Sequence, residues 1–256
     1  MDASDVKNKI SFYKKKLLFA LPWSWWGWVH KLAAGRFFRK FKFRVTAVGK
    51  GSYIDSSVHI LGIDHVSIGT NTTLSENVWL NVNHRNGISK KIVIGNNCHI
   101  GKGNFFSSGP LIHVKDFGFT GLDCHFLGCA HRTESPMTPY ISSGLTAGDE
   151  IVIGVNCWLA TSVTIFQGVH IGWGSVIGAR SVVFKDVPPF SVAVGNPCKV
   201  IKRFNFKENK WTDICDWLEE YEKYIPNEPQ YLEKLNFTHS GQDLALLSSS
   251  HKFGYL

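Results

Sequence analysis

The 256-residue sequence lacks an apolar run long enough to cross a bilayer. Its longest such stretch, LLFALPWSWWGWV, covers 13 residues between Lys16 and His30 and contains Pro22. A membrane-spanning helix needs roughly 20 residues. The sequence also lacks a secretory signal peptide, with its basic start, apolar run and small-residue cleavage site. We therefore expect the folded body to lie in the reducing cytoplasm, where disulfides are rare.

A disulfide framework is also missing, although the chain has six cysteines. Cys98 and Cys157 stand at the same position of two similar segments, the fifth residue of IGNNCH and of IGVNCW. This placement is typical of cysteine used as a small apolar residue in a repeated fold.

Excess positive charge is absent from most of the chain, despite a formal net charge of +8. The first 50 residues hold twelve Lys or Arg against two Asp, which leaves 16 bases and 18 acids for the other 206 residues. A nucleic-acid-binding protein carries a basic surface over its folded body. The charge distribution therefore argues against nucleic acid as a partner.

What the sequence does have is a period of six. Aliphatic residues recur at every sixth position through 151–183, namely Ile153, Leu159, Ile165, Ile171, Ile177 and Val183. The same register extends upstream to about residue 52, with a two-residue slip between Ile60 and Ile68. Three strand-and-turn units of six residues close one triangular coil, so the pattern predicts a mainly β fold, a parallel β-helix of hexapeptide repeats. Glycine often follows the aliphatic residue, and we expect these glycines to adopt positive φ at tight corners.

Two polar segments interrupt the repeat, and the period is lost near residue 204. Residues 81–93 and 130–150 read as loops, the usual place for functional residues on a rigid scaffold. Beyond 204, apolar residues at helical spacing from Trp211 to Tyr221 predict a helix capped by Thr212 or Asp213. The expected organisation is thus a basic aromatic arm (1–50), a β-helix (51–204) and a C-terminal helical tail (205–256).

Residues 155–204 resemble the hexapeptide-repeat acyltransferases, in the branch that contains galactoside and maltose O-acetyltransferases and acetyltransferases of capsule and exopolysaccharide clusters. The matching segments are Trp158 in a W-I-G-like turn, GSVIGARSVV, KDVPPFSVAVGNP and CKVIKR. The resemblance implies a left-handed coil and a homotrimer with active sites between neighbouring prisms. It also implies acetyl-CoA as co-substrate and no metal.

By the same resemblance, His131 in LGCAHRTESP is the general base that takes the proton of the acceptor hydroxyl. The alternative for a lone loop histidine is a solvated surface residue. Asp123, Glu134 and Asp149 are candidates for orienting the imidazole, and each can equally be an exposed charge. The segment CHFLGCAH can also be interpreted as a metal site, but its spacing matches no common zinc signature.

The resemblance further implies two sets of binding residues, for each of which a solvated surface side chain is the alternative. The coenzyme A set comprises Trp158, Ala160, Thr161 and Ala179 beside the pantetheine arm, and Lys185, Lys199, Lys202 and Arg203 at the phosphates. The acceptor set comprises Asn81, His84 and Arg85, which precede or lie within the first interruption of the repeat.

The expected function is acetyl-CoA-dependent O-acetylation of a sugar hydroxyl, in a surface polysaccharide or its lipid- or nucleotide-linked precursor. Two alternatives stay open: N-acetylation of an amino sugar nucleotide, and a β-helix scaffold without catalysis. Residues 7–44 alternate basic clusters with Trp and Phe, which is typical of a segment on an anionic membrane surface. These aromatic residues can equally pack against the prism or within a trimer contact.

Overall fold

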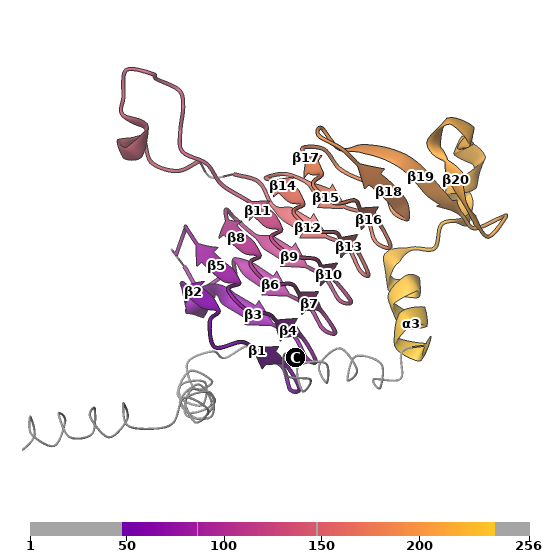
Figure 1. Ribbon diagram of the computed structural model, residues 1–256, viewed down its shortest axis with the longest axis horizontal. Helices are drawn as coiled ribbons and strands as arrows, with labels where there is room; N and C mark the ends of the chain where they lie inside the picture. Colours follow the sequence, from indigo (N-terminus) through magenta and orange to yellow (C-terminus); the bar gives the residue numbers. More distant parts are fainter. Residues whose placement is uncertain (1–47, 86, 147, 239–256) are drawn as a thin grey trace, which may run out of the picture. The chain divides into compact units, whose positions relative to one another are not determined.

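Three parallel sheets form the sides of a prism, as the hexapeptide pattern predicts (Figure 1). The computed structural model describes residues 48–85, 87–146 and 148–238. The proposed membrane segment 7–44, the rest of the arm before residue 48, and residues 239–256 lie outside this range. The prediction of a left-handed parallel β-helix is confirmed.

Each coil of the chain visits the three sheets in turn, and we name the sheets face 1, face 2 and face 3 in that order. Face 1 has the strand order β1 (Tyr53–Ile54), β4 (Thr73–Leu74), β7 (His99–Ile100), β10 (Phe119–Thr120), β13 (Trp158–Leu159), β16 (Val176–Ile177), β18 (Ser191–Val194), β19 (Lys199–Asn205) and β20 (Lys210–Asp213). Face 2 has the order β17 (Val182–Val183), β14 (Thr164–Phe166), β11 (His125–Leu127), β8 (Phe105–Ser108), β5 (Trp79–Val82) and β2 (His59–Leu61). Face 3 has the order β15 (His170–Ile171), β12 (Ile151–Ile153), β9 (Ile112–Val114), β6 (Ile92–Ile94) and β3 (Val66–Ile68). The turns between the faces are the 1–2, 2–3 and 3–1 corners.

The sixth-position residues point into the prism, so the core follows the sequence register. From Ile68 to Val183 the repeated aliphatic residues are almost completely buried, whereas Ile54 and Ile60 in the first coil are only partly covered. Because each inward residue stacks on the equivalent residue of the next coil, one apolar column runs along the prism.

The corner glycines have a different role from the one that the sequence suggests. Gly69 and Gly101 do not have positive φ; Asn71, Asn97 and Asn156 at the 3–1 corner do, with φ between 51° and 55°. A Cβ on Gly101 would lie 2.2 Å from the carbonyl oxygen of Gly121 in the next coil. These glycines therefore allow close stacking of coils, while asparagine, which tolerates the left-handed region, makes the turn.

Two stacked aromatic rings lie in the core. Phe106 and Phe126 lie in successive coils with ring centroids 4.2 Å apart, and both are fully buried. We expect Phe126→Ala to lower the free energy of unfolding by about 3–5 kcal/mol, measured by denaturant titration, because it leaves a cavity that the rigid coils cannot close. Phe237→Ala, at a side chain that is 92% exposed, should change it by less than about 0.5 kcal/mol. Equal effects of the two substitutions would contradict this packing.

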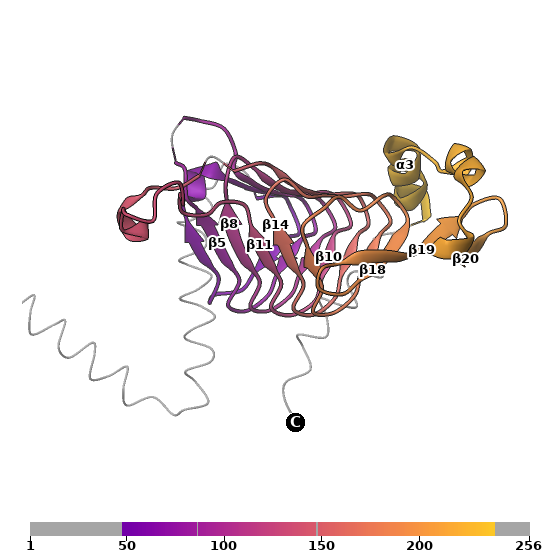
Figure 2. The ribbon, with the colours of Figure 1, turned by 90° about the horizontal axis from the view of Figure 1, so that it is seen from above.

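Both predicted interruptions leave the prism at the 2–3 corner. The first connects β5 to β6, and the second connects β11 to β12 and carries the short 3₁₀-helix η2 (Tyr140–Ser142). A further 3₁₀-helix, η1 (Ile63–His65), lies at the same corner in the first coil. Figures 1 and 2 show the longer loop projecting far from the coils.

The C-terminal region differs from the predicted helix. The chain turns back after β18, so that β19 and β20 join face 1 as antiparallel strands, followed by the 3₁₀-helices η3 (Ile214–Asp216) and η4 (Glu219–Tyr224). Trp211 packs edge-on against Phe204, with ring centroids 5.4 Å apart, which places it in a strand despite its helical spacing. The α-helix comes later, as α3 (Glu228–Thr238). None of the described helices is long and apolar enough to span a membrane.

Candidate functional site

His131 lies at the neck of the long loop, just after β11 reaches the 2–3 corner. Its side chain is exposed, and its backbone pairs with Leu145 on the returning strand of the loop. The amide of Thr146 donates to the carbonyl of Ala130 (2.7 Å), and the Thr146 hydroxyl accepts from the amide of Ala130 (3.1 Å). The neck is therefore closed by backbone contacts, which fix the position of His131 on the prism.

Two residues of the first interruption brace this neck. His84 Nε2 lies 3.0 Å from the carbonyl oxygen of Thr146, so this nitrogen carries the proton and donates it. Asn83 Nδ2 lies 2.9 Å from Cys129 Sγ and 2.9 Å from Ser107 Oγ. The segment after β5 and the loop after β11 are thus joined at the 2–3 corner, two coils apart.

The other predicted acceptor residues lie around this brace. Asn81 Nδ2 donates to Asn83 Oδ1 (2.9 Å), so Asn81 is linked to the same group. Arg85 is exposed, and its Nε donates to the carbonyl of Val82 (2.9 Å). Sequence reasoning missed Asn83. The signal that could have found it is its position directly after a face 2 strand, equivalent to that of Gly109 and Cys129 in the following coils.

The three carboxylates predicted to orient His131 do not contact it. Asp123 is at the 1–2 corner, at the opposite end of β11, and Glu134 is exposed in the outer part of the loop. Asp149 lies against Gly168. Over the described residues, no hydrogen bond or ion pair joins any of these carboxylates to His131, so none of them is assigned that role.

The cysteines of CHFLGCAH, the segment considered above as a metal site, do not lie together. Cys124 points into the core, and burial raises the pKa of its thiol to about 11, which disfavours the thiolate that a metal requires. Cys129 is beside Asn83 at the 2–3 corner. In the part of the chain that the structure describes, no three His, Cys, Asp or Glu side chains are grouped to hold a metal ion.

The predicted pantetheine residues gather along the 1–2 corner in successive coils. The amide of Ala160 donates to the carbonyl of Ile177, and the amide of Arg180 donates to Thr161, both at 2.9 Å. Thr161 and Ala179 are exposed there, and Trp158 is exposed as the first residue of β13 on face 1, where its ring stacks on Phe119 with centroids 6.2 Å apart. We call this line of residues, from Trp158 to Ala179, the corner edge.

The four predicted phosphate-binding cations are placed unequally. Lys185 and Lys199 are exposed, and Lys202 is exposed with its ammonium group 3.4 Å from Asp213. Arg203, in contrast, has a side chain only 6% exposed. It pairs with Glu222, donates to the carbonyl of Pro189 (3.2 Å) and lies 4.5 Å from the centre of the Trp217 ring. Because these contacts occupy the guanidinium group, we remove Arg203 from the phosphate set: it anchors the C-terminal segment instead.

The Arg203–Glu222 pair predicts that removing Glu222 and removing Arg203 lower the free energy of unfolding by different amounts. Glu222→Ala leaves the buried guanidinium without its counter-charge and should lower the free energy of unfolding by about 3 kcal/mol. Arg203→Ala leaves only Glu222, whose side chain is 47% exposed and can be hydrated, so the loss should be smaller. Denaturant unfolding of both variants measures this difference. A larger loss for Arg203→Ala would show that packing on Trp217, and not charge, holds the segment.

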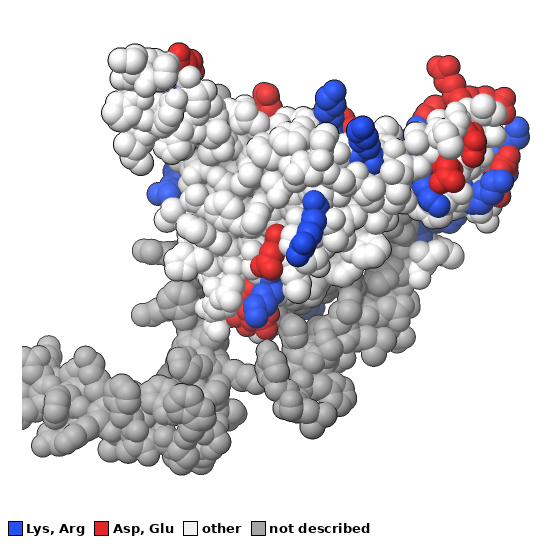
Figure 3. Space-filling model, turned by 45° about the horizontal axis from the view of Figure 1, so that its top comes forward, with Lys and Arg blue, Asp and Glu red and all other residues white. Residues whose placement is uncertain are grey.

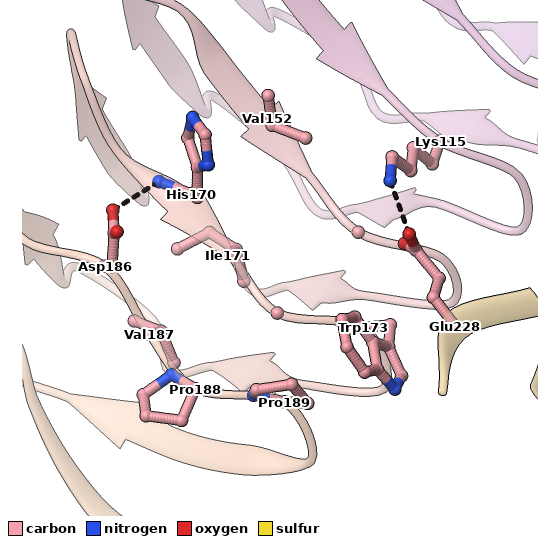
Figure 4. Close-up of a pocket in the computed structure, with 12 residues that line it drawn as sticks. Lys115, Val152, His170, Ile171, Trp173, Asp186, Val187, Pro188, Pro189 and Glu228 are labelled. Carbon is pink, nitrogen blue, oxygen red and sulfur yellow. Dashed lines mark hydrogen bonds and ion pairs between the residues drawn. The ribbon is translucent and has the colours of Figure 1, made fainter. Parts of the chain in front are cut away.

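A pocket of about 360 Å³ lies elsewhere, on face 3 (Figure 4). Lys115 and Glu228 form an ion pair of 2.5 Å at one side, and the amide of His170 donates to Asp186 at the other. Trp173 lines the pocket, and its indole N–H donates to the carbonyl of Pro226 (3.2 Å). None of the predicted site residues lines this pocket.

Within one chain, the corner edge and His131 lie at opposite ends of face 2. Ser162, beside the corner edge, is level with Asp123, whereas Leu127 is level with Phe166. Four residues of strand therefore separate the two corners, which is at least about 13 Å at 3.3 Å per residue. Reacting atoms must approach to about 3–3.5 Å.

Comparison with known proteins gives several acetyltransferases as relatives. The protein named "Putative acetyltransferase SAV2555" from Staphylococcus aureus is 37% identical over 134 residues, which cover 52% of this chain and 65% of that relative, just under two thirds of its length. The "Probable macrolide acetyltransferase" of Lysinibacillus sphaericus is 37% identical over 135 residues, which cover 52% of this chain and 72% of the relative. The galactoside O-acetyltransferase of Escherichia coli is 35% identical over 144 residues, which cover 54% of this chain and 67% of the relative.

Solved structures agree on the fold. AntD, an N-acyltransferase from Bacillus cereus solved with dTDP and 3-hydroxybutyryl-CoA, superposes with a TM-score of 0.56 at 20% identity, covering 77% of this chain and 96% of AntD. No model of a protein family matches the sequence. The chain has the coil repeat and the corner residues of this fold, and it matches relatives over two thirds or more of their length. It therefore belongs to the hexapeptide-repeat acyltransferases.

Proposed function

We propose that this protein transfers the acetyl group of acetyl-CoA to a hydroxyl group of a sugar. The observation that carries the proposal is the position of His131 at a neck that His84 and Asn83 fix to the prism. A general base has to be held at a defined point next to the acceptor, and a histidine titrates in the range where it can take a proton at neutral pH.

In the proposed reaction His131 removes the proton of the acceptor hydroxyl while its oxygen attacks the thioester carbonyl of acetyl-CoA. The carbonyl electrons move onto oxygen, which needs a hydrogen-bond donor such as a backbone N–H. The attack gives a tetrahedral intermediate, and its collapse breaks the carbon–sulfur bond. The proton on His131 then passes to the departing thiolate, so the products are the acetyl ester and free coenzyme A.

The corner edge is the proposed site of the pantetheine arm. Its exposed residues, Trp158, Thr161 and Ala179, lie in two successive coils and offer an apolar surface to the arm. Lys185, Lys199 and Lys202 are exposed cations that can bind the phosphates.

A second copy of the chain is needed to bring these parts together. Because about 13 Å of face 2 separates the corner edge from the corner of His131, we propose that the site forms between neighbouring prisms of a homotrimer. In a cyclic assembly each copy gives its corner edge to one neighbour and receives the edge of the other. Face 2 exposes Leu61, Trp79 and Phe184, which supports contact with another chain.

The acceptor separates this proposal from its alternatives. Galactoside O-acetyltransferase, among the relatives, favours a sugar hydroxyl, whereas AntD has been solved with dTDP-4-amino-4,6-dideoxyglucose and favours an amino sugar nucleotide. A thiol-release assay with acetyl-CoA over a panel of mono- and oligosaccharides and amino sugar nucleotides tests both. Release only with amino acceptors would replace O- by N-acetylation, and no release with any acceptor would favour a scaffold without catalysis.

A further inference from the structure

The pocket on face 3 has no part in the proposed reaction. Its volume of about 360 Å³ is at the lower end of the range for ligand pockets, about 300–1,000 Å³. Lys115 and Trp173 line it at the 3–1 corner, the one corner that does not border face 2. The contact proposed between copies uses face 2 and its two corners, so it leaves this part of the pocket open.

Two charged side chains at opposite sides of the pocket keep unused hydrogen-bonding atoms (Figure 4). Lys115 has three ammonium N–H groups and donates one of them to Glu228, which leaves further donors. Asp186 accepts the amide of His170 with Oδ1 (2.8 Å), and over the described residues its Oδ2 has no hydrogen-bond partner. A ligand that reaches both sides must accept at one end and donate at the other. Hydroxyl groups do both.

Apolar surface lies between these two polar sides. Pro188 and Pro189 run from Asp186 toward Trp173 along one edge of the pocket (Figure 4), and Val152 lines it from β12. The indole N–H of Trp173 is already bonded to the carbonyl of Pro226, so the ring is held in place and offers apolar surface. This combination suits a sugar ring, which has C–H groups on its faces and hydroxyl groups around its edge.

The charge of the pocket distinguishes among sugars. Two carboxylates, Asp186 and Glu228, accompany a single ammonium group, that of Lys115. Figure 3 shows more acidic side chains gathered around β20, at the same end of the molecule. Because like charges repel, phosphate and carboxylate groups are disfavoured here, and an amine would meet the ammonium group of Lys115. The pocket therefore favours a neutral sugar.

The pocket is also close to the neck that carries His131. Strand β12, with Val152, completes the coil to which β11 belongs. Val152 follows Thr146 of the neck by six residues, so the two are no more than about 22 Å apart. An oligosaccharide can extend from the pocket toward His131, whereas a single sugar fills only one of the two places.

We propose that the face 3 pocket binds one unit of a neutral oligosaccharide, while another unit of the same chain presents its hydroxyl to His131. The unit in the pocket places C–H groups on Trp173 and the prolines, accepts from Lys115 and donates to Asp186. This inference rests on the proposed function for the sugar acceptor. It adds that the acceptor is an uncharged oligosaccharide and not a nucleotide-linked sugar.

Calorimetric titration of the protein without acetyl-CoA tests binding apart from acetyl transfer. The probes are two neutral trisaccharides, galactotriose and maltotriose, and the anionic trigalacturonic acid. We expect at least one neutral trisaccharide to bind, with a Kd about tenfold or more below that of trigalacturonic acid. If neither neutral trisaccharide binds, or if the anionic one binds equally well, the inference fails.

The same titrations separate this inference from the proposed function. Trisaccharide binding without thiol release from acetyl-CoA would refute acetyl transfer and leave the sugar site in place. Thiol release with sugar acceptors but without trisaccharide binding would refute the sugar site and leave acetyl transfer in place.

Matched variants locate the bound sugar. Trp173→Ala should raise the Kd of the neutral trisaccharide by about tenfold or more, because it removes apolar surface from the pocket. Trp211→Ala, at an indole that is 42% exposed in β20 and outside the pocket, should change it by less than about twofold. Equal effects of the two variants would contradict the proposal.

Asp186→Asn tests the charge argument at an exposed residue. It keeps an oxygen for the amide of His170 and removes the negative charge. The preference for the neutral over the anionic trisaccharide should therefore fall to about threefold or less. An unchanged preference would show that charge in this pocket does not select the sugar.

Steady-state kinetics connect the pocket to the reaction. In Trp173→Ala, kcat/KM for the trisaccharide should fall about tenfold relative to kcat/KM for its monosaccharide, since only the longer acceptor reaches the pocket. Trp211→Ala should leave this ratio unchanged. An equal fall for both acceptors in Trp173→Ala would mean that Trp173 supports the fold and not a sugar site.

Discussion

His131→Ala is expected to lower kcat for acetyl transfer by about 10² to 10⁴, the range for a lost general base. The substitution removes the group that accepts the hydroxyl proton, while the side chain is exposed and has no part in the core. The free energy of unfolding should therefore stay within about 0.5 kcal/mol of that of the parent. Thiol release from acetyl-CoA with a saturating acceptor measures the loss.

His170→Ala is the matched control, because His170 is also an exposed histidine but lies on face 3. It should retain nearly full activity. A loss below fivefold for His131→Ala, or the same loss for both variants, would remove His131 from the mechanism.

The coiled body could be predicted from sequence because each coil repeats the same physical requirement. An inward position every six residues must be apolar and the corner must stack closely, so Ile153 and Leu159 carry the same information as Ile94 and Ile100. The prediction was wrong about the corner glycines, because a sequence does not show whether glycine is needed for its φ or for the approach of another chain segment.

The C-terminal segment could not be predicted in this way. Trp211 and Trp217 have helical spacing, but their surroundings are set by β18, which aligns β19, and by Arg203, which reaches Trp217. Such contacts depend on where the prism ends. Local spacing contains no information about that edge, and tertiary pairing overrides helix propensity.

For the candidate site, the motif around His131 predicts a general base, and this role stays a prediction. The sequence did not predict the contacts that hold this residue in place. Its brace comes from residues 83 and 84, about 47 positions upstream and across an insertion, where no alignment of repeats fixes the register. Arg203 was misassigned because a surface cation and a buried anchor look the same in a sequence.

Ala179→Trp is the second substitution with a large expected effect. It places an indole across the corner edge, where the pantetheine arm is proposed to lie, and a displacement of the thioester by about 1 Å can cost about 10²-fold in rate. We expect kcat/KM for acetyl-CoA to fall by about 100-fold or more. Ala179 is exposed, so the prism should fold as before.

Ser56→Trp is the control for bulk at this corner. Ser56 is exposed at the same 1–2 corner but five coils away, about 24 Å at 4.8 Å per coil. It should leave kcat/KM for acetyl-CoA within about twofold of the parent. A similar loss in both variants would mean that the corner edge does not bind the coenzyme.

Co-expression of His131→Ala with Ala179→Trp tests the central claim, that each site combines His131 of one copy with the corner edge of another. Each variant alone should have about 1% of parental activity or less. In randomly mixed trimers, roughly one quarter of the sites receive an intact histidine from one chain and an intact edge from its neighbour. The account therefore predicts that the purified mixed protein regains about a quarter of parental thiol release. Activity no greater than the average of the two variants, in trimers shown to contain both chains, would contradict it.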